Sequence, residues 1–360
     1  MKYRETEILD ATDVGASGTK TIDINLLDPI SRIDIMWSYK IVNTMLAQPG
    51  HMISKIELVD GSDVLFSMNG LECQALNIYD RKVLAMNAPM QCGGNWGQCT
   101  FGIDFGRWLW DRELAFVPGN FRNPQLKITF DETVVFGANA DNYLEVFAQC
   151  FDEKVISPIG FLMSKEHYSY DPGGSGKYHY IDMPTDHTVR QMLIRGFKSQ
   201  KDPLDILAEA RLTEENRKRD VFDLDILDYF ERSVDVLPMV KEFWQEYSSE
   251  TVDLYCRYFT PTNFMTICTA LPQSSAHIIY IPTAIRGGYM SWRANTTVMC
   301  YGVIEGYLPN HCLAFPFGPQ SELDAWYDVQ TKGSIQLRIK SGTEGDGSDV
   351  GIILQQLRRY

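Results

Sequence analysis

TKTIDINLLDPISRIDI, residues 19–35, contains two short runs in which apolar and polar residues alternate, separated by Asp28-Pro29. Alternation with a period of two is typical of strands that bury one face, and Asp-Pro favours a turn between them. The pattern returns 159 residues later, where Ile181 takes the place of Ile22 and Ile194 that of Ile35. We interpret the stretch as the opening of a unit that the chain contains twice.

The later parts of the two units also correspond. Three further matches keep the same order in both halves: Leu114-Ala115-Phe116 with Leu313-Ala314-Phe315, Gln125-Leu126-Lys127-Ile128 with Gln336-Leu337-Arg338-Ile339, and residues 143–147 with 351–354. A repeat of this length is a duplicated domain, because solenoid repeats have periods of about 20–50 residues. We therefore expect Ile22 to superpose on Ile181 and Leu126 on Leu337.

The composition is that of a folded, acidic protein. The chain has 360 residues, of which 44% are hydrophobic and 22% charged, so it can bury two cores. Its 18 Phe, 18 Tyr and 7 Trp favour strands over helices. A net charge of −14 argues against a surface that binds nucleic acid by neutralising phosphates, and no sequence-specific nucleic-acid binding is expected.

Strand patterns dominate both units. Alternating or β-rich runs predict strands at 53–59, 64–68, 126–130 and 143–151, and again at 177–183 and 189–197. Helical spacing predicts a short helix at 71–83 and another at 239–247, and residues 277–281 read as a strand. Residues 204–227 fit either an amphipathic helix or a strand–turn–strand hairpin, and the duplication favours the hairpin.

The densest Gly, Pro and Ser stretch of the chain precedes the second copy, at 170–176. We predict a first domain at 1–165, a linker at 166–176 and a second domain at 177–360. Residues 235–300 have no counterpart of similar length in the first copy, so they predict an enlarged loop region on the second domain.

Signatures of catalysis are missing from the sequence. The six histidines show no HxxxH, HExxH or HxH spacing that would place two imidazoles on one metal, and no GxSxG motif is present. We therefore expect no enzyme, no cofactor and no metal, although sequence alone leaves a catalytic carboxylate pair open. Aromatic clusters at 108–110 and 243–244 fit either a sugar-stacking platform or packing, and packing is favoured.

The cysteines indicate a reducing compartment. None of the eight falls into paired CxxC spacing, and the amino end has no apolar segment of a secretory signal. We expect reduced, mostly buried thiols in a protein made in the cytoplasm of a host cell. A bridge between Cys92 and Cys99 stays open, because both lie in a Gly-rich loop. No run approaches the roughly 18 apolar residues of a membrane span.

Two copies of an all-β unit predict two tandem eight-stranded jelly-roll barrels with short helices in their loops. The opening at 19–35 and ISKIELVDGSDVLFSMNGLECQALNIYDR at 53–81 resemble the first strands of the double jelly-roll major capsid proteins that link tectiviruses with adenovirus hexon. The organisation of the whole chain fits this family, and its motifs cover about 60 residues. The chain lacks the long basic amino-terminal arm that many members of this family have.

The resemblance implies a structural role. Such a chain forms pseudo-hexameric trimers that tile an icosahedral virus shell, with minor capsid and vertex proteins, and in some cases an internal lipid membrane, as partners. It also implies that 235–300 forms an outward tower or a clasp between subunits, and that loops and this insertion make the trimer contacts. The alternatives are a two-domain carbohydrate-binding or receptor-binding spike protein and, less favoured, a cupin-like enzyme.

The two ends of this acidic chain each carry basic residues: Lys2 and Arg4 at the start, and Arg358 and Arg359 at the end. A jelly roll whose terminal strands lie side by side brings both ends of the chain to one rim. In the capsid proteins that the sequence resembles, that rim faces the interior of the shell. We therefore expect these four residues to face anionic lipid headgroups or nucleic acid, with solvated termini as the alternative.

Overall fold

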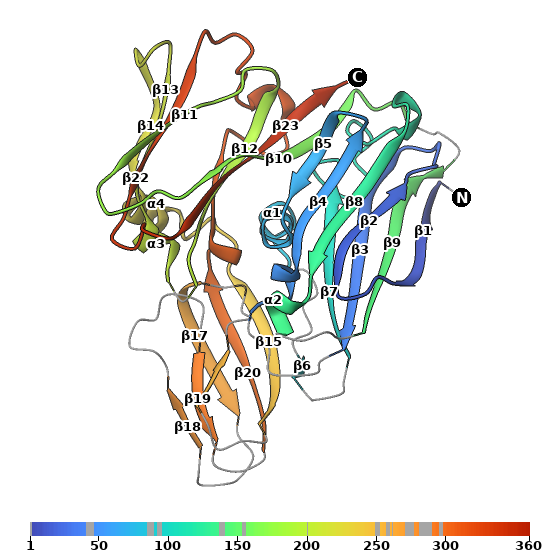
Figure 1. Ribbon diagram of the computed structural model, residues 1–360. Coiled ribbons are helices and arrows are strands. Elements are labelled where there is room, and N and C mark those ends of the chain that lie inside the picture. The colour runs from blue at the N-terminus through green and yellow to red at the C-terminus, as the bar shows by residue number, and fades with distance from the viewer. Residues whose placement is uncertain are drawn as a thin grey trace.

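The computed structural model shows two β-barrels side by side, with a smaller group of strands extending from one end (Figure 1). The residues that the structure describes are 2–40, 47–84, 90–91, 96–136, 141–152, 156–199, 201–248, 253–256, 260, 262–270, 277–280, 290–294 and 298–360.

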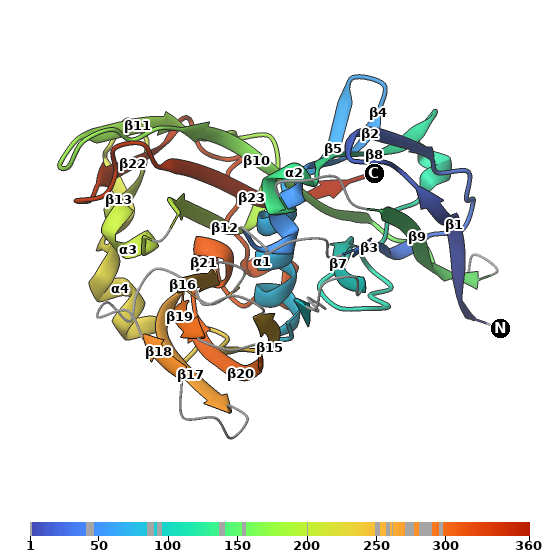
Figure 2. The same ribbon diagram turned by 60° about the horizontal axis from the view of Figure 1, so that its bottom comes forward.

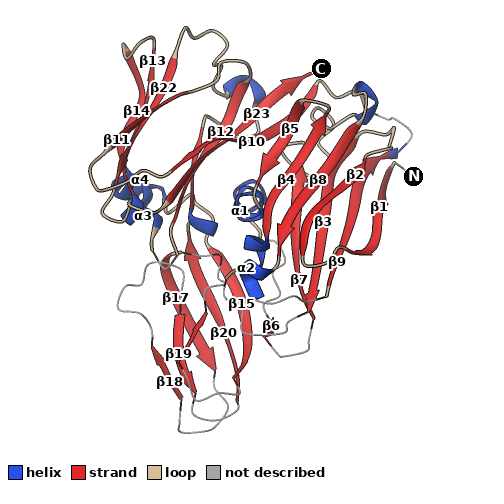
Figure 3. Ribbon diagram, viewed as in Figure 1, coloured by secondary structure: helices blue, strands red, loops and turns tan. Residues whose placement is uncertain are grey.

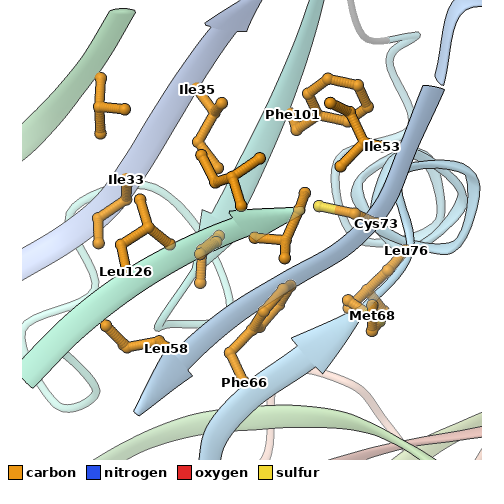
Figure 4. Close-up of a cluster of buried hydrophobic side chains, with 14 of the residues drawn as sticks. Ile33, Ile35, Ile53, Leu58, Phe66, Met68, Cys73, Leu76, Phe101 and Leu126 are labelled. Carbon is orange, nitrogen blue, oxygen red and sulfur yellow. The ribbon is translucent and has the colours of Figure 1, made fainter. Parts of the chain in front are cut away.

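Barrel one is built from two four-stranded layers, ordered β1-β9-β3-β7 and β2-β8-β4-β5. Its strands are β1 (Tyr3–Asp13), β2 (Ser17–Asp23), β3 (Ile30–Lys40), β4 (Ile53–Asp60), β5 (Asp63–Met68), β7 (Trp96–Asp104), β8 (Pro124–Asp131) and β9 (Asn142–Phe151). Alternating apolar residues on β3 and β8 face one another in the interior, as Ile33 and Leu126 do in Figure 4.

Barrel two repeats this plan with layers β10-β23-β12-β21 and β11-β22-β13-β14. Its strands are β10 (Gly160–Tyr170), β11 (Tyr178–Asp182), β12 (Thr188–Phe197), β13 (Leu207–Glu214), β14 (Arg219–Asp225), β21 (Cys312–Pro316), β22 (Ile335–Ser341) and β23 (Asp349–Arg359). In each barrel the first strand pairs with the last, and the second with the seventh. This order is that of an eight-stranded jelly roll, so the predicted fold class is confirmed.

Strand register confirms the sequence repeat. Ile22 lies opposite Leu126 in the β2–β8 pair, and Ile181 lies opposite Leu337 in the β11–β22 pair. The hairpin reading of 204–227 is also confirmed, because β13 and β14 pair antiparallel after a short helix, α3 (Pro203–Ile206).

One of the matches quoted for the repeat is wrong. Leu313 of β21 lies opposite Ile194, whereas the equivalent Ile35 lies opposite Phe101 of β7. Residues 313–315 therefore correspond to 101–103 rather than to 114–116. The sequence misled because a short apolar triplet is common in any buried segment, and only the pairing identifies its partner.

The predicted linker lies largely inside barrel two. Residues 166–170 belong to β10, which pairs with β23 as β1 pairs with β9, and 171–176 form the loop from β10 to β11. The glycines therefore mark a loop within a barrel, like the short loop from β1 to β2. We infer that the division between the barrels falls between β9 and β10, before residue 160.

A helix follows the fifth strand of each barrel: α1 (Gly70–Arg81) after β5, and α4 (Ile226–Ser233) after β14. α1 matches the helix predicted at 71–83. It begins at a capping box, in which the Asn69 side chain accepts from the Glu72 backbone N–H and the Glu72 side chain accepts from that of Asn69. It ends at Lys82, whose φ of 59° is left-handed. A further short helix, α2 (Thr133–Phe136), follows β8.

The enlarged region forms two small sheets, ordered β17-β20-β15-β6 and β16-β19-β18 (Figure 3). Their strands are β6 (Met90–Gln91), β15 (Val240–Ser248), β16 (Asp253–Cys256), β17 (Asn263–Ala270), β18 (His277–Tyr280), β19 (Met290–Ala294) and β20 (Val298–Tyr307). The helix predicted at 239–247 is wrong, whereas the strand predicted at 277–281 is confirmed. Val240 and Glu242 are buried while Lys241 and Phe243 are exposed, a period of two that pairing with β20 imposes.

Candidate assembly surfaces

Helix α1 lies between the two barrels (Figure 2) and is buried over most of its length. Its Asp80 carboxylate accepts hydrogen bonds from Arg190 at 2.5 Å, from Gln191 at 2.7 Å and from Gln355 at 2.8 Å. The Arg190 and Asp80 side chains are only 4% and 3% exposed. A buried carboxylate with three donors from β12 and β23 fixes the position of α1 on barrel two.

A second buried ion pair lies near the other end of α1. Arg195 of β12 contacts Glu72 and Asp349, each at 3.1 Å. The pKa of Glu166, on β10, is raised to about 8, chiefly by burial and also by the neighbouring Glu72 carboxylate, while Arg195 acts in the opposite direction. One guanidinium thus faces three carboxyl groups at this junction.

This arrangement predicts that stability falls with rising pH. The Glu166 carboxyl holds its proton up to about pH 8 in the folded protein, but releases it near its ordinary pKa of 4.5 in the unfolded chain. Between these values the folded state binds more protons, so the free energy of unfolding decreases as the pH rises.

Replacing Glu166 by glutamine will reduce that decrease between about pH 5 and about pH 8.5, as urea denaturation can measure. The matched control is Glu57→Gln on the outer face of β4, which will keep the wild-type pH dependence. An unchanged slope in Glu166→Gln would contradict the assignment.

The barrels also share a sheet and a core. β5 pairs in parallel with β10, through Phe66 opposite Ser164 and Ser67 opposite Lys165, and this pair joins the layers of both barrels into one eight-stranded sheet. The core cluster of barrel one includes residues of barrel two, among them Phe161 of β10. The two barrels therefore form one rigid body, which suits a building block of fixed shape.

The structure places the four predicted basic residues in two different settings. Arg4 contacts Asp28 at 2.6 Å and Asp152 at 3.5 Å, and Arg358 contacts Asp63 at 2.5 Å. Hydrogen bonding to Asp28 and Asp63 raises the pKa of each guanidinium. Lys2 and Arg359 are exposed, and within the described part of the chain no ion pair involves them.

Both ends of the chain are tied to the same loop, between β7 and β8. Arg112 donates to the Tyr3 hydroxyl at 3.2 Å. The Tyr360 hydroxyl donates to the Ala115 carbonyl at 2.8 Å and accepts from the Val117 N–H at 2.7 Å. The termini thus lie on one rim, at the end of the barrels opposite β17–β20 (Figure 1). Sequence did not reveal the acidic partners of Arg4 and Arg358, because Asp28 and Asp63 lie 24 and 295 residues away along the chain.

The two aromatic clusters have different surroundings. Trp108 is 51% exposed, whereas Trp110 packs against Tyr3 and Phe151. Phe243 is 58% exposed on β15. The side chain of Trp244 lies outside the described residues.

A hollow that the sequence did not suggest lies on the outer layer of barrel two, with a volume of about 250 Å³. Its lining is polar: Asp182, Thr213, Asn216, Arg217, Ser334 and Gln336. Arg217 lies over the ring of Tyr180, 4.9 Å from its centroid, and Tyr180 is 52% exposed. Residues 215–217 all have left-handed backbone angles. Of these three residue types only Asn adopts such angles readily, so Asn216 was the one sign of this loop in the sequence.

The thiols described by the structure are buried and free: Cys73, Cys99, Cys150 and Cys312. Burial raises the pKa of Cys73 to about 12, so this thiol is protonated and unreactive near neutral pH. The bridge left open between Cys92 and Cys99 involves Cys92, which lies outside the described residues.

Neither a protein-family model nor a curated protein matches the sequence. Among solved structures, STIV MCP superposes with a TM-score of 0.59 at 11% identity, over 99% of this chain and 96% of that chain. The major capsid protein P2 from Bacteriophage PM2 gives 0.56 at 10% identity, over 99% and 98%. A chain of Sulfolobus Turreted Icosahedral Virus gives 0.60 at 10% identity, over 99% and 90%. This chain has the double jelly-roll fold.

In this double jelly roll, the described residues include no group of three or more His, Cys, Asp or Glu side chains that could hold a metal ion. No helix among them has the length and apolar character needed to cross a membrane.

Proposed function

We propose that the chain is a structural major capsid protein that forms pseudo-hexameric trimers, and that these trimers tile an icosahedral virus shell. The observation that carries the proposal is the pair of complete eight-stranded barrels held as one rigid body over the whole chain. The match to STIV MCP and to P2 over 99% of this chain supports it. Two similar barrels per chain and three chains per ring would give six similar lobes. The protein would then be a component of the virion without enzymatic activity.

The test is the assembly state of the purified protein. Light scattering at micromolar concentration is expected to give the mass of three chains, and electron microscopy of the assembled material is expected to show closed shells. A stable monomer at that concentration would refute the proposal.

We further propose that the rim with the chain ends faces the interior of the shell, and that β15–β20 project outward. The two features lie at opposite ends of the barrels, which supports opposite orientations (Figure 1). Minor capsid proteins, vertex proteins and, where present, an internal lipid membrane are the proposed further partners.

Charge reversal tests the inner rim. The variant with Lys2→Glu and Arg359→Glu changes only exposed side chains without ion pairs among the described residues, so we expect it to fold normally. Losing attraction of about 1 kcal/mol per residue to an anionic surface will make its shells release their contents at lower salt.

The variant with all four basic residues reversed, which adds Arg4→Glu and Arg358→Glu, will have a larger effect. It will also lose stability, because Asp28 and Asp63 lose their partners. Salt tolerance of shells measured by light scattering separates these effects. Unchanged salt tolerance in the exposed pair would mean that the basic ends have no role.

A second candidate, carbohydrate binding, is favoured by one observation. Tyr178 and Tyr180 are exposed on β11, and Tyr180 adjoins the polar hollow. Exposed rings beside amide and carboxylate groups suit a sugar. Binding of glycans to the wild type, lost in Tyr180→Ala, would support this function, and the absence of binding would exclude it.

A further inference from the structure

The repeat makes the surfaces of the two barrels comparable, strand by strand. β5 and β14 are the fifth strands of their barrels, and β10 and β1 are the first strands. Within the chain, β5 pairs in parallel with β10. β14 and β1 each end a sheet and lie on opposite sides of the molecule (Figure 1). Each chain therefore has one unused edge of each kind.

The first strands can be aligned residue by residue. Glu5 of β1 lies opposite Gln149, and Ser164 of β10 lies opposite Gln355. Both glutamines occupy the same place in the last strand of their barrel, directly beside a register shift that the two barrels share. Glu5 therefore takes the place of Ser164, 159 residues earlier, which is the offset of the sequence repeat. Thr6 follows it.

The fifth strands align in the same way. Phe66 of β5 lies opposite Leu58, and Phe222 of β14 lies opposite Leu212. Both hairpins have a register shift after the leucine. Phe222 therefore takes the place of Phe66, and Asp223 follows it.

The sheet faces beside these edges differ in exposure. In barrel two, β12 and β23 are buried on both faces, because α1 and barrel one cover the outer face. In barrel one, the equivalent strands β3 and β9 alternate between buried and half-buried residues, with Met36 and Phe147 on the open face. The face that α1 covers in barrel two thus has an uncovered counterpart in barrel one.

We propose that β14 and α4 of one chain dock on β1 and on the outer face of β3 and β9 of a second copy, repeating the contact that β5 and α1 make with barrel two. In the parallel pairing that follows, Phe222 lies opposite Glu5 of the second copy, and Asp223 lies opposite Thr6. This inference rests on the proposed assembly and adds a specific surface to it. A contact between two different edges is head-to-tail, and such contacts form a closed ring where the rotation between neighbouring copies closes, as the proposed trimer requires. Strand edges and a helix face, in addition to loops and the 235–300 region, then hold the ring together.

Both edges are acidic. β1 carries Glu5, Glu7, Asp10 and Asp13 against Arg4, and β14 with α4 carries Asp220, Asp223, Asp225, Asp228 and Glu231 against Arg219 and Arg232. Like charges repel across such a contact, and salt screens that repulsion. Association will therefore tighten as the salt concentration rises, which is the reverse of the behaviour of an interface between opposite charges.

Disulfide trapping tests the register. The double variant with Thr6→Cys and Asp223→Cys, oxidised gently as full-length protein, is expected to give covalently linked chains on a non-reducing gel. The matched control pairs Thr6→Cys with Val221→Cys, two residues away along β14. Because a disulfide tolerates little misplacement, the first pair will cross-link at least about fivefold more than the control.

The outcomes separate the surface from the assembly. Oligomers that form while the first pair links no better than the control would overturn the surface and leave the capsid proposal standing. A protein that stays monomeric would overturn both. Phe147→Asp gives a second measure: it will weaken association at least about tenfold by light scattering, because it places a charge in the centre of the contact. Tyr178→Asp changes an exposed aromatic on β11, at the opposite edge of its sheet from β14, and will leave association unchanged. Equal effects of the two variants would also overturn the surface.

Discussion

Replacing Asp80 by alanine will lower the free energy of unfolding by about 3–5 kcal/mol, because it leaves the buried Arg190 without its carboxylate. Arg190 is 4% exposed and donates to Asp80 at 2.5 Å, so its charge cannot be rehydrated without opening the junction. Gln191 and Gln355 lose the same acceptor. Urea denaturation followed by fluorescence measures the loss.

The matched control is Asp141→Ala, which removes the partner of Lys40 from an ion pair whose side chains are 60% and 39% exposed. Exposed pairs contribute about 0–1 kcal/mol, so this variant will stay close to the wild type. If Asp80→Ala also stayed within 1 kcal/mol, roughly the limit for an exposed pair, α1 would not be the element that holds the barrels together.

Truncating Phe161 to alanine will cost about 3–5 kcal/mol, the range for a fully buried aromatic residue. Phe161 is fully buried at the start of β10, and its ring contacts Phe105, Phe116 and Tyr360. Phe161 lies on β10, the first strand of barrel two, but its side chain packs in the core cluster of barrel one. The loss will therefore affect both barrels, and unfolding will remain a single transition.

Phe243→Ala is the control for this experiment, because Phe243 is 58% exposed and buries little surface within the chain. It will change stability by less than about 0.5 kcal/mol. Two separate unfolding transitions in Phe161→Ala, with only one of them shifted, would show that the barrels unfold independently.

Local sequence patterns were enough to identify the repeated unit and most of its strands. Ile22 and Ile181 stand at the same place in two jelly rolls because inward-facing residues must recur every second position wherever a strand buries one face. The helix after β5 was also predictable, because Asn69 and Glu72 form a local capping box. These features depend only on residues close together in the chain, so the sequence alone is sufficient to predict them.

Tertiary structure alone decided the rest. Val240–Ser248 form a strand because β20 pairs with them, and a helical spacing of apolar residues cannot reveal a distant partner. Arg4 pairs with Asp28, after β2, and Arg358 pairs with Asp63, at the start of β5, so two of the four basic ends are neutralised. The sequence predicts a linker in part of β10, because the partner strand β23 comes only at the end of barrel two, far along the chain. Each of these features depends on contacts between residues far apart in the sequence, and a local sequence pattern does not indicate such contacts.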